Sequence, residues 1–296
     1  MPNWTGKLPR GLRLVKRRPP QPEDMTTFAA GVETRVRSTA TGVLEYFTLG
    51  ARAMRFAFSR PFYWRDLLTQ MDRIGVGSIP IVLLTGFFTG MVLALQSSVE
   101  LTRFGAEVYI GNLVAASMVR ELGPVLCALM VAGRSASGIA AELGSMRVTE
   151  QIDALQSFGT DPIKKLATPR ILAGLMMLPM LTVITDIVGI IGGLVISVLR
   201  LGLTADAYMQ GVLSTLAQSG FVLGYFPKDF VTGLLKPLVF GGIITLTSCY
   251  YGLNAKGGTE GVGNAATKAV VACSVTILAV DYFLTQFLFV VLRPGS

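Results

Sequence analysis

The amino-acid sequence predicts an all-α integral membrane protein with five transmembrane helices. Of its 296 residues, 51% are hydrophobic and only 15% are charged, whereas about 25% of residues are charged in typical soluble domains. Several apolar runs are also long: Ile74–Val99 contains no charged residue, and at about 1.5 Å per residue such a run crosses roughly 30 Å of hydrocarbon. We therefore place the five spans at 75–98, 112–141, 171–199, 237–254 and 270–292.

The distribution of basic residues indicates how the chain is oriented. Residues 1–74 hold thirteen Lys and Arg, and the regions after successive spans hold one, four, three, two and one. Alternate regions thus hold 13, 4 and 2 against 1, 3 and 1, so the positive-inside rule predicts a cytoplasmic N-terminus and a C-terminus on the opposite side. Residues 1–39 are interpreted as a basic cytoplasmic tail. We expect it to anchor the topology or contact anionic lipid, and we expect no nucleic acid as a partner.

Residues 40–74 are predicted to form an N-terminal amphipathic helix at the membrane interface, ahead of a membrane domain at 75–292. Apolar residues recur there at alternating three- and four-residue spacing: Leu44, Phe47, Ala51, Met54 and Phe58. Pro61 interrupts this pattern, and Tyr63 and Trp64 follow it. Aromatic residues of this kind are typical anchors at the level of the lipid headgroups.

A short charged helix is predicted between spans 2 and 3, on the cytoplasmic side. Thr149 can cap a helix that begins at Glu150, where an acidic residue suits the positive end of the helix dipole. One apolar face is expected from Ile152, Leu155 and Phe158, and Gly159 ends the helix. Such a helix could lie on lipid headgroups or insert into another protein, and composition leaves both open.

The second span contains charges that a lipid-facing helix would not tolerate. Arg120, Glu121, Arg134 and Glu142 lie in or near the membrane, and each would cost several kcal/mol if it faced lipid. They are therefore expected to face a bundle interior, a cavity or an interface, although Arg120 could simply anchor the outer end of the span. The candidate partners are Asp186, Lys236 and Asp281.

Small residues recur every four positions along the second span. One row comprises Ala132, Ala136, Ala140 and Gly144, and the row beside it comprises Gly133, Ser137, Ala141 and Ser145. GxxxG pairs also occur at Gly86 and Gly90 and at Gly189 and Gly193. Such rows allow helix backbones to approach closely, within one chain or between two copies.

Several classes of activity are excluded or disfavoured by the residues that the chain lacks. It has no histidine, and its three cysteines do not have the spacing of metal ligands; this argues against His-based triads and zinc sites. It also lacks a G-x-x-x-x-G-K-[ST] sequence for ATP binding. We expect no metal and no cofactor.

A longer pattern resembles a known family. The stretch "RELGPVLCALMVAGRSASGIAAELGSMRVTEQIDAL" (120–155) is similar to the signature of the MlaE/YrbE-type permeases of lipid-transporting ABC (MCE) systems. The resemblance extends through "GTDPIKKLATPRILAGLMMLPMLTVITDIVGIIGG" (159–193) to "YYGLNAKGGTEGVGNAATKAVV" and "DYFLTQFLF" near the end, and covers roughly residues 40–292.

The resemblance implies a permease subunit that is not itself an enzyme. Such a subunit sits in the bacterial inner membrane, with its C-terminus in the periplasm, and moves phospholipid between the inner and outer membranes. Its expected partners are a second copy of the chain, a cytosolic P-loop ATPase that hydrolyses the ATP, and a periplasmic MCE-domain protein. The short cytoplasmic helix would be the coupling helix that docks the ATPase.

The resemblance also assigns roles to particular residues. The expected coupling residues are Arg147, Thr149, Glu150, Gln151, Ile152, Asp153 and Leu155. Within this set, Ile152 and Leu155 would fill a groove of the ATPase. The expected polar residues of the lipid cavity are Arg120, Glu121, Arg134, Lys236 and Asp281. Lys236 and Asp281 could instead be structural partners of the other charges. The resemblance does not identify the apolar wall of the cavity, for which we name Leu93, Leu95, Val125 and Leu129 as candidates.

Two other functions compete with this one. An ion-coupled secondary transporter could use Glu121, Asp186 and Asp281 as ion sites, but the odd number of spans and the lack of an evident inverted repeat argue against it. A non-transporting membrane scaffold would recruit the same partners, and its intramembrane charges should tolerate replacement.

Overall fold

The computed structural model describes residues 22–218, 221–222 and 226–291, so the first 21 residues of the predicted basic tail lie outside the described residues. The chain divides into two compact units, Met1–Glu45 and the larger Tyr46–Ser296. The helix α1 (Pro22–Ala57) runs from the first unit into the second.

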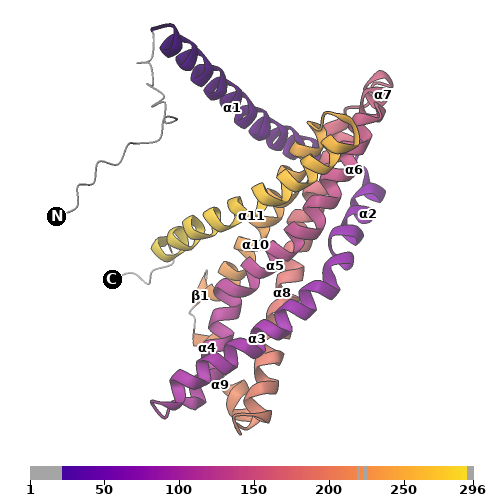
Figure 1. The fold of residues 1–296 in the computed structure, drawn as a ribbon. Helices are drawn as coiled ribbons and strands as arrows, with labels where there is room; N and C mark the ends of the chain where they lie inside the picture. Colours follow the sequence, from indigo (N-terminus) through magenta and orange to yellow (C-terminus); the bar gives the residue numbers. More distant parts are fainter. Residues whose placement is uncertain (1–21, 219–220, 223–225, 292–296) are drawn as a thin grey trace, which may run out of the picture. The chain divides into compact units, whose positions relative to one another are not determined.

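Five helices among the described residues are long and apolar enough to cross a membrane, which confirms the predicted number (Figure 1). They are Trp64–Thr102, Glu107–Val148, Ile163–Leu199, Gly233–Leu253 and Gly258–Leu288. Most begin well before the predicted limits. The first contains residues 64–74, which the sequence had assigned to the interface.

The first three long helices are each assembled from shorter segments. The first comprises α2 (Trp64–Ile74), η1 (Val76–Ser78) and α3 (Ile79–Thr102). The second comprises η2 (Glu107–Tyr109), α4 (Ile110–Ser117), η3 (Met118–Leu122), α5 (Gly123–Val131), η4 (Ala132–Ala136) and α6 (Ser137–Val148). The third comprises η5 (Ile163–Ala167) and α8 (Thr168–Leu199). Segments η3, η4 and η5 are π-helical turns, which widen a helix locally and often occur at functional sites.

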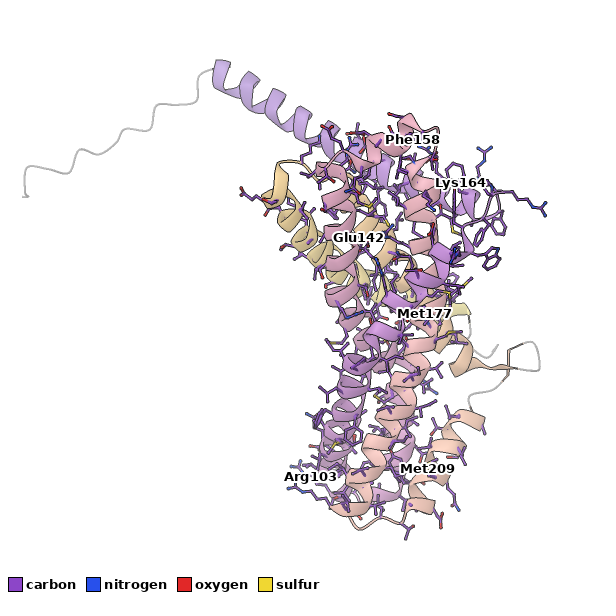
Figure 2. The ribbon with its side chains drawn as sticks, turned by 90° about the vertical axis from the view of Figure 1, so that its right-hand side faces the viewer. Arg103, Glu142, Phe158, Lys164, Met177 and Met209 are labelled. Atoms are coloured by element: carbon purple, nitrogen blue, oxygen red, sulfur yellow. The ribbon has the colours of Figure 1, made fainter. Side chains whose placement is uncertain are left out.

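The remaining elements complete the bundle. They are α7 (Gln151–Ser157), α9 (Ala205–Gln218), α10 (Lys228–Leu253) and α11 (Gly258–Val291). Strands β1 (Phe221–Val222) and β2 (Phe226–Pro227) pair antiparallel between α9 and α10, with Phe221 opposite Pro227. Helix α7 lies at one end of the bundle and α9 at the other (Figure 1). Phe158 marks the first end and Arg103 and Met209 the second in Figure 2.

Glycines allow the helices at the centre of the bundle to touch backbone to backbone. A Cβ on Gly90 of α3 would collide with the carbonyl oxygen of Gly189 on α8, and a Cβ on Gly174 of α8 would lie 2.8 Å from the carbonyl oxygen of Gly241 on α10. The close approach expected from the GxxxG pairs is therefore present between α3 and α8. Close backbone contact maximises van der Waals packing, which is a main force between helices in lipid.

Replacing Gly90 with Ala should lower the free energy of unfolding by about 2 kcal/mol, because the added methyl group must separate α3 from α8. The matched control is Gly133→Ala, since a Cβ there would meet nothing within 4 Å. Thermal unfolding can be followed with a thiol-reactive dye, because Cys127, Cys249 and Cys273 are all free and buried. Equal melting temperatures for the two variants would contradict this account of the packing.

The two rows of small residues on the second span have different environments. Ala132, Ala136, Ala140 and Gly144 are all buried, and they belong to the side that packs within the bundle. Gly133 and Ser145 of the neighbouring row are exposed, and Ser137 and Ala141 are half-buried. The first row therefore serves packing within the chain, and the second lies on the surface of the single chain.

Two apolar cores hold the bundle together. The larger gathers residues of α1, α2, α3, α5, α6, α8, α10 and α11, and the smaller lies where α4 meets α9. In the smaller core, Tyr208 is buried and donates a hydrogen bond to the Ile190 carbonyl at 3.1 Å. Burial raises the pKa of the Tyr208 phenol, so it remains a protonated donor.

The last turns of α1 present two apolar faces. Leu49 and Ala53 are buried against the bundle, and Tyr46 shares a hydrogen bond of 3.0 Å with Thr247 of α10. Phe47 and Met54, from the face that the 3-4 spacing singled out, are exposed, as is Phe58 after the helix end. The predicted apolar face therefore points away from the bundle, and its placement at a membrane interface stays a prediction.

Candidate functional site

A buried lysine forms the centre of a polar cluster inside the bundle. The Lys236 side chain on α10 has 0% exposure. Its Nζ lies 2.6 Å from Glu121 Oε2, 3.2 Å from Asp281 Oδ1 and 3.1 Å from the carbonyl oxygen of Arg120. Nζ donates hydrogen bonds to Glu121 Oε2 and to the Arg120 carbonyl, and its contact with Asp281 Oδ1 is an ion pair. The buried cation therefore lies between two carboxylates and a backbone carbonyl.

The rest of this cluster, which we call the Lys236 cluster, comes from η3 and α11. Thr285 of α11 donates a hydrogen bond to Glu121 Oε1 at 3.2 Å, so both oxygens of the Glu121 carboxylate have partners. The Glu121 side chain is nevertheless 42% exposed. The cluster therefore opens to the surface of the single chain through Glu121.

A π-helical turn carries Glu121 into this position. Segment η3 ends immediately before Gly123 and Pro124, and Pro124 has no N–H to donate to a preceding carbonyl. A wide turn leaves backbone carbonyls without their usual helical partners, and Lys236 takes one of them, the Arg120 carbonyl. The Arg120 side chain is itself exposed. The structure thus brings Glu121, Lys236 and Asp281 together, and the backbone carbonyl of Arg120 joins them.

Asp186, the third candidate partner, does not join the Lys236 cluster. It is buried on α8, and its Oδ1 has no hydrogen-bond partner among the described residues. A Cβ on Gly123 would collide with that same oxygen. The sequence correctly indicated that the charges in the spans need partners. It could not tell which of the candidates Asp186, Lys236 and Asp281 lies next to Glu121.

Arg134 lies outside the Lys236 cluster, at the junction of α2 and η1. Its Nη1 donates to the Arg73 carbonyl at 2.9 Å and to Ser78 Oγ at 3.1 Å. The guanidinium lies directly over Gly77, where any Cβ would collide with it. Arg134 therefore holds the bend between α2 and α3. Its assignment to the same lipid cavity as Glu121 stays a prediction that this placement does not support.

A second set of charges lies near Arg134, and of its members the sequence singled out Glu142 alone. Glu142 of α6 pairs with Arg73 of α2 at 2.9 Å and with the buried Arg170 of α8 at 3.0 Å. Arg170 also donates to the Leu166 carbonyl at 2.7 Å. Arg170 lies one residue before the predicted third span, so it was counted as a loop charge. Its position next to an uninterrupted apolar run was the signal in the sequence that could have indicated its burial.

The short helix α7 is present where the sequence placed it, but its start differs from the prediction. Helix α6 continues to Val148, and Thr149 caps its C-terminal end. The Thr149 hydroxyl donates a hydrogen bond to the Ser145 carbonyl. Glu150 has a left-handed backbone with φ of 60°, and the helix begins at Gln151 with no side-chain cap. The expected Thr149 cap is therefore wrong, because the chain makes a sharp left-handed turn there instead of a capped start.

The side chains of α7 divide into inward and outward groups. Ile152 is buried within the chain, Leu155 is half-buried, and Phe158 is 84% exposed at the tip of the bundle (Figure 2). Asp153 pairs with Arg147 at 2.6 Å. Ile152 was predicted to fill a groove of the ATPase, but its side chain already packs within this chain. Phe158 is the residue of this segment that presents a large apolar surface.

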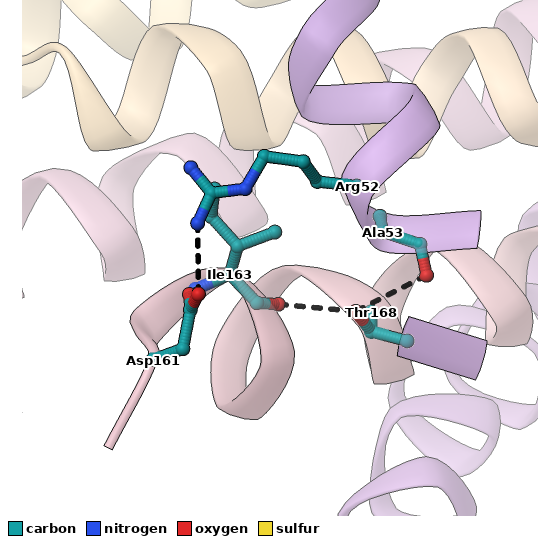
Figure 3. Close-up of polar contacts among 5 residues, drawn as sticks. All are labelled: Arg52, Ala53, Asp161, Ile163 and Thr168. Carbon is teal, nitrogen blue, oxygen red and sulfur yellow. Dashed lines mark hydrogen bonds and ion pairs between the residues drawn. The ribbon is translucent and has the colours of Figure 1, made fainter. Parts of the chain in front are cut away.

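The loop after α7 is tied to the end of α1 (Figure 3). Arg52 Nη2 lies 2.8 Å from Asp161 Oδ2, and the other oxygen of Asp161 accepts a hydrogen bond from the Ile163 amide at 2.9 Å. Thr168 Oγ1 lies 3.4 Å from the Ala53 carbonyl and 3.1 Å from the Ile163 carbonyl. A displacement of α7 would therefore pull on α1 as well as on α6 and α8.

The apolar wall proposed from sequence does not form one surface. Leu93 packs against the smaller core, whereas Val125 and Leu129 pack against the larger one. Leu95 is half-buried. Within the described residues, no group of three or more His, Cys, Asp or Glu is placed to hold a metal ion.

Comparisons with known proteins converge on one family. The family model described as Permease MlaE matches residues 67–287. A probable ABC transporter permease protein of Rickettsia felis is 41% identical over 265 residues, covering 90% of this chain and 99% of that protein. An intermembrane phospholipid transport system permease protein MlaE from Haemophilus influenzae is 36% identical over 223 residues, covering 75% and 82%. A chloroplastic protein of Arabidopsis thaliana, TRIGALACTOSYLDIACYLGLYCEROL 1, is 39% identical over 227 residues, covering 77% and 62%.

Proposed function

The chain belongs to the MlaE permease family, and from that premise we propose that it is the membrane subunit of an ABC transporter that moves phospholipid between the inner and outer membranes. The observation that carries this proposal is the Lys236 cluster, which lies inside the matched residues and opens to the surface through Glu121. A cluster of paired charges inside a membrane bundle marks a substrate or ion pathway. Here it offers the exposed carboxylate of Glu121, which Lys236 and Thr285 hold in place, to a polar lipid headgroup.

The partial exposure of Glu121 supports a second copy of the chain as a partner. A charged group that faces hydrocarbon costs several kcal/mol, and Glu121 lies well inside the second long helix, Glu107–Val148. A second copy that faces this surface would enclose the two clusters in a shared, hydrated cavity. The cavity would then hold the headgroup near Glu121 and the acyl chains along the apolar helices.

The α7 end of the bundle supports the docking of a separate ATPase. This end carries an exposed Phe158, an exposed ion pair between Arg147 and Asp153, and direct connections to α1, α6 and α8. Closure of the ATPase on ATP would move α7, and the attached helices would change the shape of the cavity. With α7 in the cytoplasm, the α9 end faces the periplasm of an inner-membrane protein, where an MCE-domain protein would exchange lipid with the cavity.

Replacing Glu121 with Gln should reduce ATP-dependent lipid transport about tenfold, because the amide pairs less strongly with Lys236 and with a cationic headgroup. The measurement is transfer of labelled phospholipid from proteoliposomes that contain the chain and its ATPase. Glu100→Gln is the matched control, since Glu100 forms an exposed ion pair with Arg103.

This assay also separates the competing functions. Transport that follows an ion gradient without the ATPase would establish a secondary transporter. Full transport by Glu121→Gln would remove the Lys236 cluster from the pathway, and complete assembly with no lipid transfer under any condition would indicate a scaffold.

A further inference from the structure

A second polar cavity lies between α2 and the second long helix, apart from the Lys236 cluster. Its volume is about 310 Å³, and its walls are formed by η4, α6 and α2. The polar and small residues of its wall are Gln70, Arg73, Arg134, Ser135, Gly138 and Glu142. The function proposed above uses none of this space.

The charge around the cavity is positive. Arg73, Arg134 and the adjoining Arg170 bring three cations, and Glu142, which pairs with both Arg73 and Arg170, brings one anion. Arg134 is held in place by its hydrogen bonds to the Arg73 carbonyl and Ser78. Its remaining N–H donors have no partner among the described residues. A planar guanidinium with spare donors, fixed in position, is suited to bind phosphate oxygens.

Ser135 supplies an independent sign that the cavity takes a polar ligand. It is 6% exposed and lines the cavity, and its Oγ has no hydrogen-bond partner among the described residues. A buried hydroxyl without a partner is costly. Ser135 belongs to the π-helical turn η4, which changes the direction of side chains relative to a regular helix. The turn places this hydroxyl beside Arg134 at the cavity.

We propose that this cavity binds an anionic phosphate group, carried by a phospholipid headgroup or present as a free phosphate ion. Arg73 and Arg134 pair with its charge, and the Ser135 hydroxyl donates to one of its oxygens. The cavity lies in the half of the bundle that ends in α7, where Glu142 stands between Phe158 and Met177 in Figure 2. The inference is independent of the transport function, because it requires binding alone.

The test measures thermal unfolding of the full chain in detergent with a thiol-reactive dye. Three probes are compared: dihexanoyl phosphatidic acid, dihexanoyl phosphatidylcholine and inorganic phosphate. Saturating phosphatidic acid should raise the melting temperature of the unaltered chain by about 5 °C, because ligand that binds only the folded state stabilises it. Net-neutral phosphatidylcholine should give less than half of that shift.

The variants are chosen so that the cavity changes and the packing does not. Gly138→Leu fills the cavity, and a Cβ at Gly138 meets nothing within 4 Å. Gly133→Leu is the matched control, because it has equal space but lies outside the cavity wall. The shift should vanish in Gly138→Leu and persist in Gly133→Leu. Arg73→Gln alters an exposed side chain and should at least halve the shift even if Gly138→Leu fails to fold.

The outcomes decide both the site and the source of its ligand. A cavity-dependent shift with phosphatidic acid alone supports a lipid headgroup, and an equal shift with inorganic phosphate supports the free ion. An unchanged shift in Gly138→Leu and Arg73→Gln would overturn the proposal. Equal stabilisation by phosphatidylcholine would overturn the requirement for an anion.

Discussion

Replacing Lys236 with Met should lower the free energy of unfolding by about 3–5 kcal/mol and abolish lipid transport. Lys236 is fully buried and pairs with two carboxylates, Glu121 and Asp281. Removal of one partner of a buried ion pair leaves uncompensated charge in a low-dielectric interior, which costs far more than the pair itself contributes. Methionine keeps most of the side-chain volume, so a loss of stability would reflect charge rather than a cavity.

The control for this prediction is Lys268→Met on α11, because Lys268 is exposed. Chemical or thermal unfolding in detergent should show the large loss for Lys236→Met only. The triple variant Lys236→Met with Glu121→Gln and Asp281→Asn should recover most of the stability, since no buried charge remains, yet it should not recover transport. Equal stability of Lys236→Met and Lys268→Met would show that the Lys236 cluster is not held by these ion pairs.

The sequence predicted the membrane architecture because hydrocarbon imposes a strict requirement on composition. A span must be apolar over about 20 residues, so five runs could be counted directly, and the structure has five such helices. Their limits were less predictable. Residues 64–74 contain four charges and were assigned to the interface; the structure joins α2 to α3 through η1, and two of these charges have partners, since Asp66 pairs with Lys165 and Arg73 with Glu142. Their placement at the interface stays a prediction.

The site could be predicted only as a set of residues, not as a geometry. The high cost of charge in a membrane indicated that Glu121 needs a partner, and Lys236 and Asp281 were among the candidates. Their meeting depends on the π-helical turn at η3 and on the rotation of α10, neither of which periodicity reveals. For the same reason the orientations of two other side chains could not be predicted. Asp186 faces Gly123, and Ile152 is buried after the left-handed residue Glu150.

Replacing Phe158 with Asp should weaken the association with the ATPase about a hundredfold while the chain remains folded. Phe158 is 84% exposed and makes no contribution to either core, so its removal costs little within the chain. Exposed aromatic residues at the centre of an interface often contribute most of its binding energy, and a charge in their place would be buried without a partner. Affinity can be measured by titrating the purified ATPase against the chain in nanodiscs.

The matched control is Phe104→Asp, because Phe104 is also 81% exposed but follows Arg103 at the opposite end of the bundle. The pair tests orientation as well as docking. If Phe158→Asp alone abolishes association, the α7 end faces the ATPase and is cytoplasmic, as the basic residues of the sequence predict. If Phe104→Asp alone abolishes it, the topology is inverted, and the coupling role passes to the loop between α3 and α4. Phe158→Leu should retain most of the affinity in the first case, since the interaction requires apolar surface rather than an aromatic ring.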